Sequence, residues 1–163
     1  TVGQGESVEY LAGLRGGHAE KYLKGLLSSA ASVPVVEPEI QSDHNGDPRT
    51  WAYTDYVKMA EILAFDLVIF AGEAGSHCVR ATLRSFMRYI EKTDPELAKK
   101  IYLLIDCMSP VIARMPDGTV IQDFTADQEE ILAECEKFGI SLVSSEEPIE
   151  RWKGRAGELL KAA

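Results

Sequence analysis

One cysteine lies where an apolar segment gives way to a helical pattern. Cys78 follows the apolar run 66–72, DLVIFAG, and a short stretch of small residues. A helix N-terminus stabilises negative charge through its dipole and unpaired N–H groups, so a cysteine there favours the reactive thiolate. Gly72 and Gly75 keep the bend thin enough for backbone N–H groups to approach a substrate oxygen. A nucleophile beside amide donors is what acyl transfer requires at the least.

The same stretch has two other interpretations. Free cysteine is among the most buried residue types, so Cys78 is equally compatible with a small core residue. The bend also contains Gly-x-x-Gly after a predicted strand, which weakly resembles a nucleotide-binding loop. Position alone does not separate a nucleophile from a core residue, and a nucleotide-binding α/β domain remains a third hypothesis.

The elements that would position this cysteine alternate along the chain. Three short apolar runs, rich in β-branched or aromatic residues, predict strands buried on both faces. They are 66–72, 100–107 and 140–146. Helical patterns precede or separate them at 51–64, 78–92 and 126–139. This order predicts an α/β fold, a parallel sheet flanked by helices in a Rossmann-like three-layer arrangement, with Cys78 at the sheet edge where ligands bind.

Each helical pattern predicts an apolar stripe that faces the sheet. The stripes are Tyr53, Val57, Ala60 and Leu63; Val79, Leu83, Phe86, Met87 and Ile90; and Ile131, Leu132, Cys135 and Phe138. A weak fourth strand is predicted near 33–36, between two prolines. A doubly wound domain usually has five or six strands, so we expect residues 1–163 to form a single domain that lacks the first strands of its fold.

Composition narrows the classes of function. The net charge of −9 argues against nucleic-acid and anionic-membrane surfaces, because phosphate binding needs clustered positive charge. Three cysteines without a Cys-x-x-Cys pair indicate a reduced, cytoplasmic protein. No apolar run is long enough to span a membrane. The small number of strands predicts a homo-oligomer, or pairing with a missing N-terminal segment.

The stretch VIFAGEAGSHCVRAT, residues 68–82, resembles a known family. It is similar to the nucleophile segment of the cysteine hydrolases in the isochorismatase-like superfamily, the nicotinamidase-related amidases. The shared pattern is an apolar strand, a glycine, small residues, Cys-Val, and a threonine three residues beyond the valine. KKIYLLIDCMSPV and FTADQEEILAECEKFGISLVSSEEPIE resemble the next strand and the last helix and strand, so the resemblance covers about residues 60–150.

The resemblance implies an amidohydrolase that cleaves a small non-peptide amide through an acyl-cysteine intermediate, with Cys78 as the nucleophile. The lysine that works with it would be Lys24, in a Lys-Gly pair, and Lys21 is an alternative without the glycine. An ammonium near the thiol favours the thiolate and stabilises a tetrahedral oxyanion. No cofactor is implied; relatives can hold a metal ion, but no ligand set for one is seen in this sequence.

The resemblance also implies the geometry of the bend. The peptide between Glu73 and Ala74 would be cis, and the N–H groups of Ala74 and Cys78 would form an oxyanion hole. Glu73, His77 and Asp106 would line the pocket, with Asp106 as architecture rather than the general base. Neighbouring residues at a helix start point about 100° apart, so we do not expect His77 to pair directly with Cys78.

One departure from the family leaves a second function open. The family's catalytic aspartate precedes the lysine, whereas the first aspartate of this chain is Asp43. The alternative to an enzyme is therefore a non-catalytic half-domain or degenerate member that acts as a binding or assembly subunit.

We interpret the acidic stretch 43–48 as a turn rather than a calcium loop, and Cys107 and Cys135 as structural residues.

Overall fold

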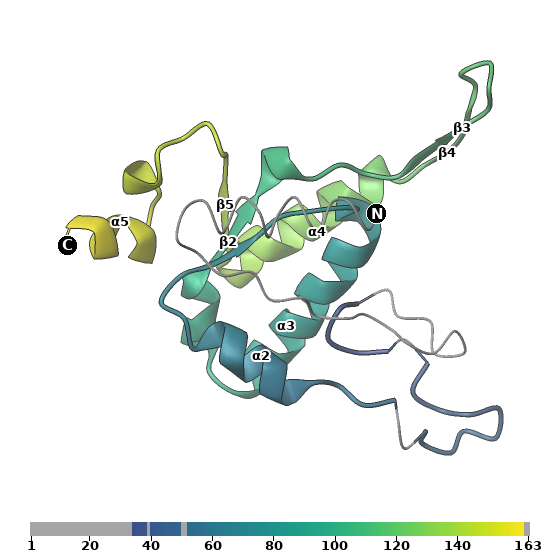
Figure 1. Cartoon of the computed structure of the whole chain (residues 1–163), viewed down its shortest axis with the longest axis horizontal. Helices are drawn as coiled ribbons and strands as arrows, with labels where there is room; N and C mark the ends of the chain where they lie inside the picture. The colour runs from purple at the N-terminus through teal and green to yellow at the C-terminus, as the bar shows by residue number, and fades with distance from the viewer. Residues whose placement is uncertain (1–33, 39, 50–51, 162–163) are drawn as a thin grey trace, which may run out of the picture.

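The computed structural model describes residues 34–38, 40–49 and 52–161 of the chain (Figure 1). Three strands form a parallel sheet in the order β1-β2-β5. They are β1 (Val68–Phe70), β2 (Ile101–Leu104) and β5 (Ser141–Val143). The helices are α2 (Tyr56–Leu63), α3 (Arg80–Lys92), α4 (Thr125–Phe138) and α5 (Arg155–Lys161). The alternation of helices and parallel strands confirms the predicted α/β class.

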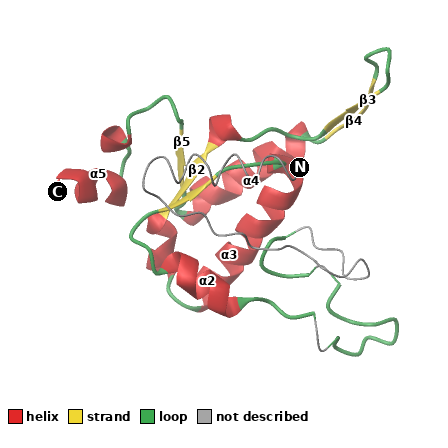
Figure 2. Cartoon of the chain, viewed as in Figure 1, coloured by secondary structure: helices red, strands yellow, loops and turns green. Residues whose placement is uncertain are grey.

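Helices cover both faces of this sheet (Figure 2). The side chains along β2 alternate between the two faces. Ile101 and Leu103 are fully buried in a core shared with α2, α3 and α4. Tyr102 points to the opposite face, where its ring stacks on Trp152 with the centroids 5.5 Å apart. Its hydroxyl donates to the carbonyl oxygen of Lys153 at 2.8 Å and accepts the N–H of Ala156 at 3.0 Å, which fixes the start of α5.

The predicted stripes are confirmed for two helices and wrong for the third. All five residues predicted for α3 are buried, and α4 buries Ile131 and Cys135 and ends at Gly139 in the left-handed conformation. In α2 the core side chains are Met59 and Leu63, whereas Val57 is 71% exposed. The carboxylate of Asp55 accepts the N–H of Lys58 and caps the start of α2 at Tyr56. Tyr53 lies before the helix and is also exposed.

The predicted weak strand is wrong within its described part. Residues 34–37 form bends, and Val33 lies outside the described residues. Pro34 and Pro38 have no N–H to donate to a sheet. Val36 instead inserts its side chain into the core, and the N–H of Val35 donates to the hydroxyl of Thr82 at 3.0 Å. The segment is therefore held by α3 and not by a neighbouring strand.

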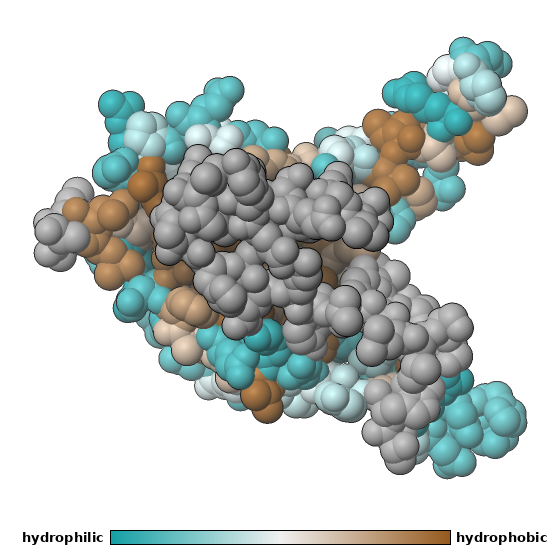
Figure 3. Space-filling model, in the orientation of Figure 1, coloured by the Kyte–Doolittle hydropathy of each residue, from teal (hydrophilic) through white to brown (hydrophobic). Residues whose placement is uncertain are grey.

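A hairpin between β2 and α4 was not predicted. It consists of β3 (Ile112–Arg114) and β4 (Val120–Asp123), which pair antiparallel and extend away from the rest of the described chain (Figure 1). Its turn contains Asp117-Gly118, with the glycine at φ 89° and the Asp117 carboxylate accepting the N–H of Thr119. Apolar side chains lie along this hairpin (Figure 3), and Ile121 is 63% exposed. Asp-Gly between apolar runs is a strong hairpin signal that could have revealed it.

The acidic stretch before α2 forms a turn, as predicted. The carboxylate of Asp43 accepts the N–H groups of Asn45 and Asp47, at 2.8 and 3.0 Å. Among the described residues, no helix is long and apolar enough to cross a membrane.

Candidate functional site

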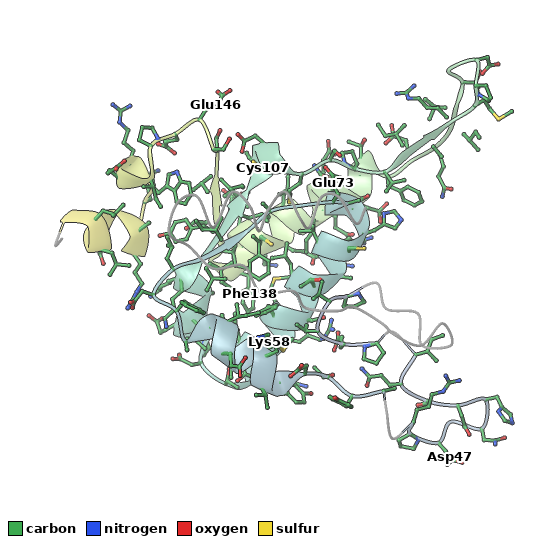
Figure 4. All side chains as sticks on the ribbon, viewed as in Figure 1. Asp47, Lys58, Glu73, Cys107, Phe138 and Glu146 are labelled. Carbon is green, nitrogen blue, oxygen red and sulfur yellow. The ribbon has the colours of Figure 1, made fainter. Side chains whose placement is uncertain are left out.

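Cys78 lies at the carboxyl edge of the parallel sheet, as the sequence predicts. After β1 the chain bends through 71–74 and enters a π-helical turn, Gly75–Val79, which continues into α3. Cys78 is half-buried in that turn. The segments that follow β2 and β5 end at the same edge, where Figure 4 labels Glu73 and Cys107.

Backbone hydrogen bonds tie the bend to the segment after β2. The N–H of Gly72 donates to the carbonyl oxygen of Cys107 at 3.0 Å, and that of Gly75 donates to Ser109 at 2.9 Å. A Cβ on Gly75 would lie 2.8 Å from Cδ of Gln128 and closer still to its Oε1. A side chain at position 75 would therefore displace the end of Gln128, which reaches from α4 to the turn that carries the cysteine.

The peptide between Glu73 and Ala74 is cis, as expected. The carbonyl oxygen of Ala74 accepts the N–H groups of His77 and Val79, at 3.0 and 3.1 Å. The N–H of Ala74 has no hydrogen-bond partner within the part of the chain that the structure describes. An amide donor thus remains available in the same bend as Cys78.

Thr82 fixes the backbone of the cysteine from within α3. Its hydroxyl donates to the carbonyl oxygen of Cys78 at 2.7 Å and accepts the N–H of Val35 at 3.0 Å. The side chain is buried. Thr82 therefore links the turn that carries Cys78 to the segment before α2.

Asp106 joins the ends of two neighbouring strands. Its carboxylate accepts the N–H and the hydroxyl of Ser145, at 2.9 and 2.7 Å, and the hydroxyl of Ser144 at 3.0 Å. The hydroxyl and N–H of Ser145 stabilise the charged form and lower the pKa of Asp106 to about 2. A carboxylate this acidic and this well bonded serves to connect β2 to β5, in keeping with the architectural role expected for it.

Glu73 lies at the same edge and contacts the segment after β2. Its two carboxylate oxygens each lie 2.8 Å from the hydroxyl of Ser109. Because the Ser109 carbonyl also binds Gly75, this serine holds the bend by both its backbone and its side chain. Glu73 is exposed, so it borders the site from the solvent side.

His77 is held between a buried serine and an aromatic ring. Its Nδ1 lies 2.8 Å from the hydroxyl oxygen of Ser76, and that oxygen accepts the N–H of Val111 at 3.0 Å. Its ring meets Phe124 edge to face, with the centroids 4.5 Å apart. No contact between the His77 ring and Cys78 is recorded among the described residues, in line with the expected divergence of the two side chains.

A cleft of about 780 Å³ begins at Ser76 and His77 and runs along α3. One wall carries cations at four-residue intervals along the helix. They are Arg80, Arg84, Arg88 and Lys92. Phe124 and Asp127 line the same cleft near His77, whereas Cys78 is not among the lining residues. The cysteine therefore sits beside the end of the cleft rather than in its wall.

Ion pairs to α4 neutralise the two arginines of this wall that lie nearest to His77 in the sequence. Arg80 binds Asp127 and Glu130, and Arg84 binds Glu134 through two N–H groups, one of them at 2.9 Å. The hydrogen bonds to Glu134 raise the pKa of Arg84, and the bonds from Arg84 lower that of Glu134. These charges fasten α3 to α4 and keep the turn before α3 in place.

The remaining site predictions concern two lysines, the other two cysteines and a metal ion. Lys24 and its alternative Lys21 lie outside the described residues, so their positions relative to Cys78 remain predictions. Cys135 is fully buried in the core, as expected for a structural residue. Cys107 is exposed, and it contributes to the fold through its carbonyl oxygen and not by packing its side chain. Among the described residues, no group of three or more potential ligands could hold a metal ion.

Sequence analysis missed several residues that hold this site. They are Ser76, Ser109, Phe124, Gln128, Ser144 and Ser145. Most act through contacts between segments about 35 residues apart, for which periodicity gives no signal. The hairpin signal at Asp117-Gly118 could have indicated Phe124. A hairpin returns the chain to the end of β2, and Phe124 follows its second strand.

No family model, curated protein or solved structure matches this chain.

Proposed function

We propose that this protein is a cysteine hydrolase that cleaves a small non-peptide amide through an acyl-Cys78 intermediate. The position of Cys78 carries the proposal: a half-buried thiol at the carboxyl edge of a parallel sheet, in a bend that contains the available N–H of Ala74. Active sites of open α/β sheets lie at this edge, and amide donors near a nucleophile stabilise a developing oxyanion. The resemblance to the nicotinamidase-related amidases supports the same chemistry.

The proposed reaction has two stages. The Cys78 thiolate adds to the carbonyl carbon of the amide. The resulting oxyanion accepts hydrogen bonds from the N–H groups of Ala74 and Cys78. The C–N bond breaks, and the leaving nitrogen takes up the proton that the thiol gave up. Water then adds to the thioester, which releases the carboxylic acid and restores the thiol. By resemblance, the ammonium of Lys24 stabilises the negative charge in both stages.

Ammonia release from a panel of small primary amides tests this proposal. We expect turnover by the native chain, and a loss of about a thousandfold or more in Cys78→Ala, because the covalent route is removed. Cys107→Ala is the matched control, since it removes an exposed cysteine at the same edge and should keep the activity. Intact-mass spectrometry of a rapidly quenched reaction should show the acyl group on the peptide that contains Cys78.

Two results would contradict the enzyme. One is the absence of both ammonia release and acylation across the panel; the other is equal turnover in Cys78→Ala. Either result would favour the alternative function, a non-catalytic binding or assembly subunit.

A further inference from the structure

The buried hydroxyl of Ser76 lies against one of the two ring nitrogens of His77. Ser76 is 2% exposed, and its oxygen accepts the N–H of Val111. A hydroxyl has one proton to donate, and a buried polar proton without an acceptor is costly. Among the described residues, the recorded acceptor for that proton is Nδ1 of His77, at 2.8 Å. The satisfied arrangement is therefore Ser76 O–H donating to an unprotonated Nδ1.

We propose that Ser76 is a positioning residue that holds His77 in the Nε2–H tautomer, so that His77 offers a hydrogen-bond donor to the cleft. A neutral imidazole that accepts at Nδ1 carries its proton at Nε2. His77 lines the cleft, and no partner for Nε2 is recorded within the described part of the chain. The donor at the end of the cleft is thus free for a ligand.

The hairpin fixes this ring from both of its ends. Val111, just before β3, binds Ser76, while Phe124, just after β4, packs its ring against His77. The N–H of Phe124 donates to the carbonyl oxygen of Val111 at 3.0 Å, which closes a ring of four residues. A flip of the imidazole would exchange Nδ1 for a carbon and break the bond to Ser76. The tautomer and the orientation of His77 are set together.

The donor implies a chemical class of substrate, and this step rests on the proposed function. An amide that reaches Cys78 with its carbonyl carbon would need a second acceptor, such as a carbonyl oxygen, for the Nε2–H of His77. A site built to hydrogen-bond its substrate discriminates strongly against analogues without the partner, because its own polar group is left unpaired. We therefore infer that the preferred substrates are small amides with a second hydrogen-bond acceptor.

Nuclear magnetic resonance of the histidine rings tests the tautomer without any assay of activity. Two-bond ¹H–¹⁵N spectra of the ¹⁵N-labelled chain distinguish the two neutral forms, and His77→Gln assigns the signals. We expect the Nε2–H pattern in the native chain and in Ser76→Thr, and a mixed pattern in Ser76→Ala. Ser109→Ala is the matched control, because the Ser109 hydroxyl bonds Glu73 and should leave the pattern unchanged.

An Nδ1–H pattern in the native chain would overturn the proposal, as would an unchanged pattern in Ser76→Ala. If Ser76→Ala does not fold, the native spectrum decides alone, because the proposal requires Nε2–H there. The substrate class is tested with 4-oxopentanamide and pentanamide, which differ by one ketone oxygen. We expect kcat/KM to favour the ketone by about tenfold or more in the native chain, and this ratio to fall toward one in Ser76→Ala.

The two proposals fail in different ways. Absence of turnover on both amides and on the wider panel would contradict the hydrolase and leave the tautomer to be judged by its spectrum. Turnover with the same preference in Ser76→Ala would contradict the role of Ser76 and leave the hydrolase standing.

Discussion

Thr82 shows how one hydroxyl can hold two distant segments of the chain together. It bonds the carbonyl oxygen of Cys78 on one side and the N–H of Val35 on the other. Among the described residues, it is the recorded acceptor for that N–H, and the side chain is buried. Removal of the hydroxyl therefore breaks two partly buried hydrogen bonds, which is more costly than the loss of an exposed one.

We expect Thr82→Val to lower the free energy of unfolding by about 1–3 kcal/mol, because valine keeps the shape and removes the acceptor. Thr82→Ser keeps the hydroxyl and should cost less than Thr82→Val. Urea unfolding of both variants beside the native chain measures the difference. Equal losses would show that the methyl group, and not the hydrogen bond, carries the effect.

The three cysteines should differ in their rate of alkylation by iodoacetamide. Burial raises the pKa of the Cys135 thiol to about 12, so at pH 8 its thiolate fraction is roughly a thousandfold below that of an ordinary cysteine. We expect Cys135 to label last by a wide margin. On the proposed function, Cys78 labels faster than the exposed Cys107. Peptide mapping of a time course gives the order, and equal rates for all three would contradict both expectations.

At the level of elements, β2 and β5 are connected by the carboxylate of Asp106. This residue lies just beyond the end of β2 and binds two serines just beyond the end of β5. The pKa of Asp106 falls from its ordinary value of 3.8 to about 2, chiefly because the hydroxyl and N–H of Ser145 bond its charged form. A carboxyl whose pKa is lower in the folded state stabilises the fold above its unfolded pKa. That stabilisation is lost as the pH falls through the folded pKa.

We therefore expect the native chain to lose stability between about pH 4 and pH 2 partly through Asp106. Asp106→Asn cannot titrate, so its free energy of unfolding should be lower than that of the native chain at pH 6 and should fall less steeply over that interval. Chemical unfolding at a series of pH values measures both curves. Parallel curves would mean that Asp106 does not contribute to the acid sensitivity.

The elements show where sequence analysis succeeds and fails. Buried strands and the stripes of α3 and α4 were predictable, because the burial of one face imposes a period on the sequence. The stripe predicted for α2 was wrong, because the core takes up Met59 and Leu63 and leaves Val57 exposed, and the spacing of its apolar residues did not distinguish these two faces. Cys78 could be located from its place between strand and helix. Ser76 and Phe124 could not, because the hydrogen bond and the ring contact that define them join distant segments.

On the scale of the whole molecule, the exposed apolar side chains include some on β1 and some on the hairpin. On β1, Ile69 is 43% exposed, although Tyr102 on the same face of the neighbouring β2 is fully buried. The hairpin exposes Ile121 and Val120 as well. Two-stranded hairpins are marginally stable alone in water, and exposed apolar patches often mark contacts with another chain.

We expect the chain to self-associate, in line with the homo-oligomer predicted from its small number of strands. Light scattering from micromolar to near-millimolar concentration measures the mass. Ile121→Glu and Ile69→Glu each place a charge at one of the two exposed sites, and the variant that weakens association identifies the site. Val57→Glu, on an exposed position of α2, is the control. A native chain that remains a monomer throughout would contradict the prediction.

The anchoring of the hairpin makes it a site at which the protein could be engineered. Both of its ends contact the residues around His77, whereas its tip at Asp117-Gly118 lies on an exposed turn. A reporter domain inserted between Asp117 and Gly118 should therefore be accommodated. Deletion of one residue from β3 or β4 would shift Val111 against Phe124 and disturb the imidazole they hold.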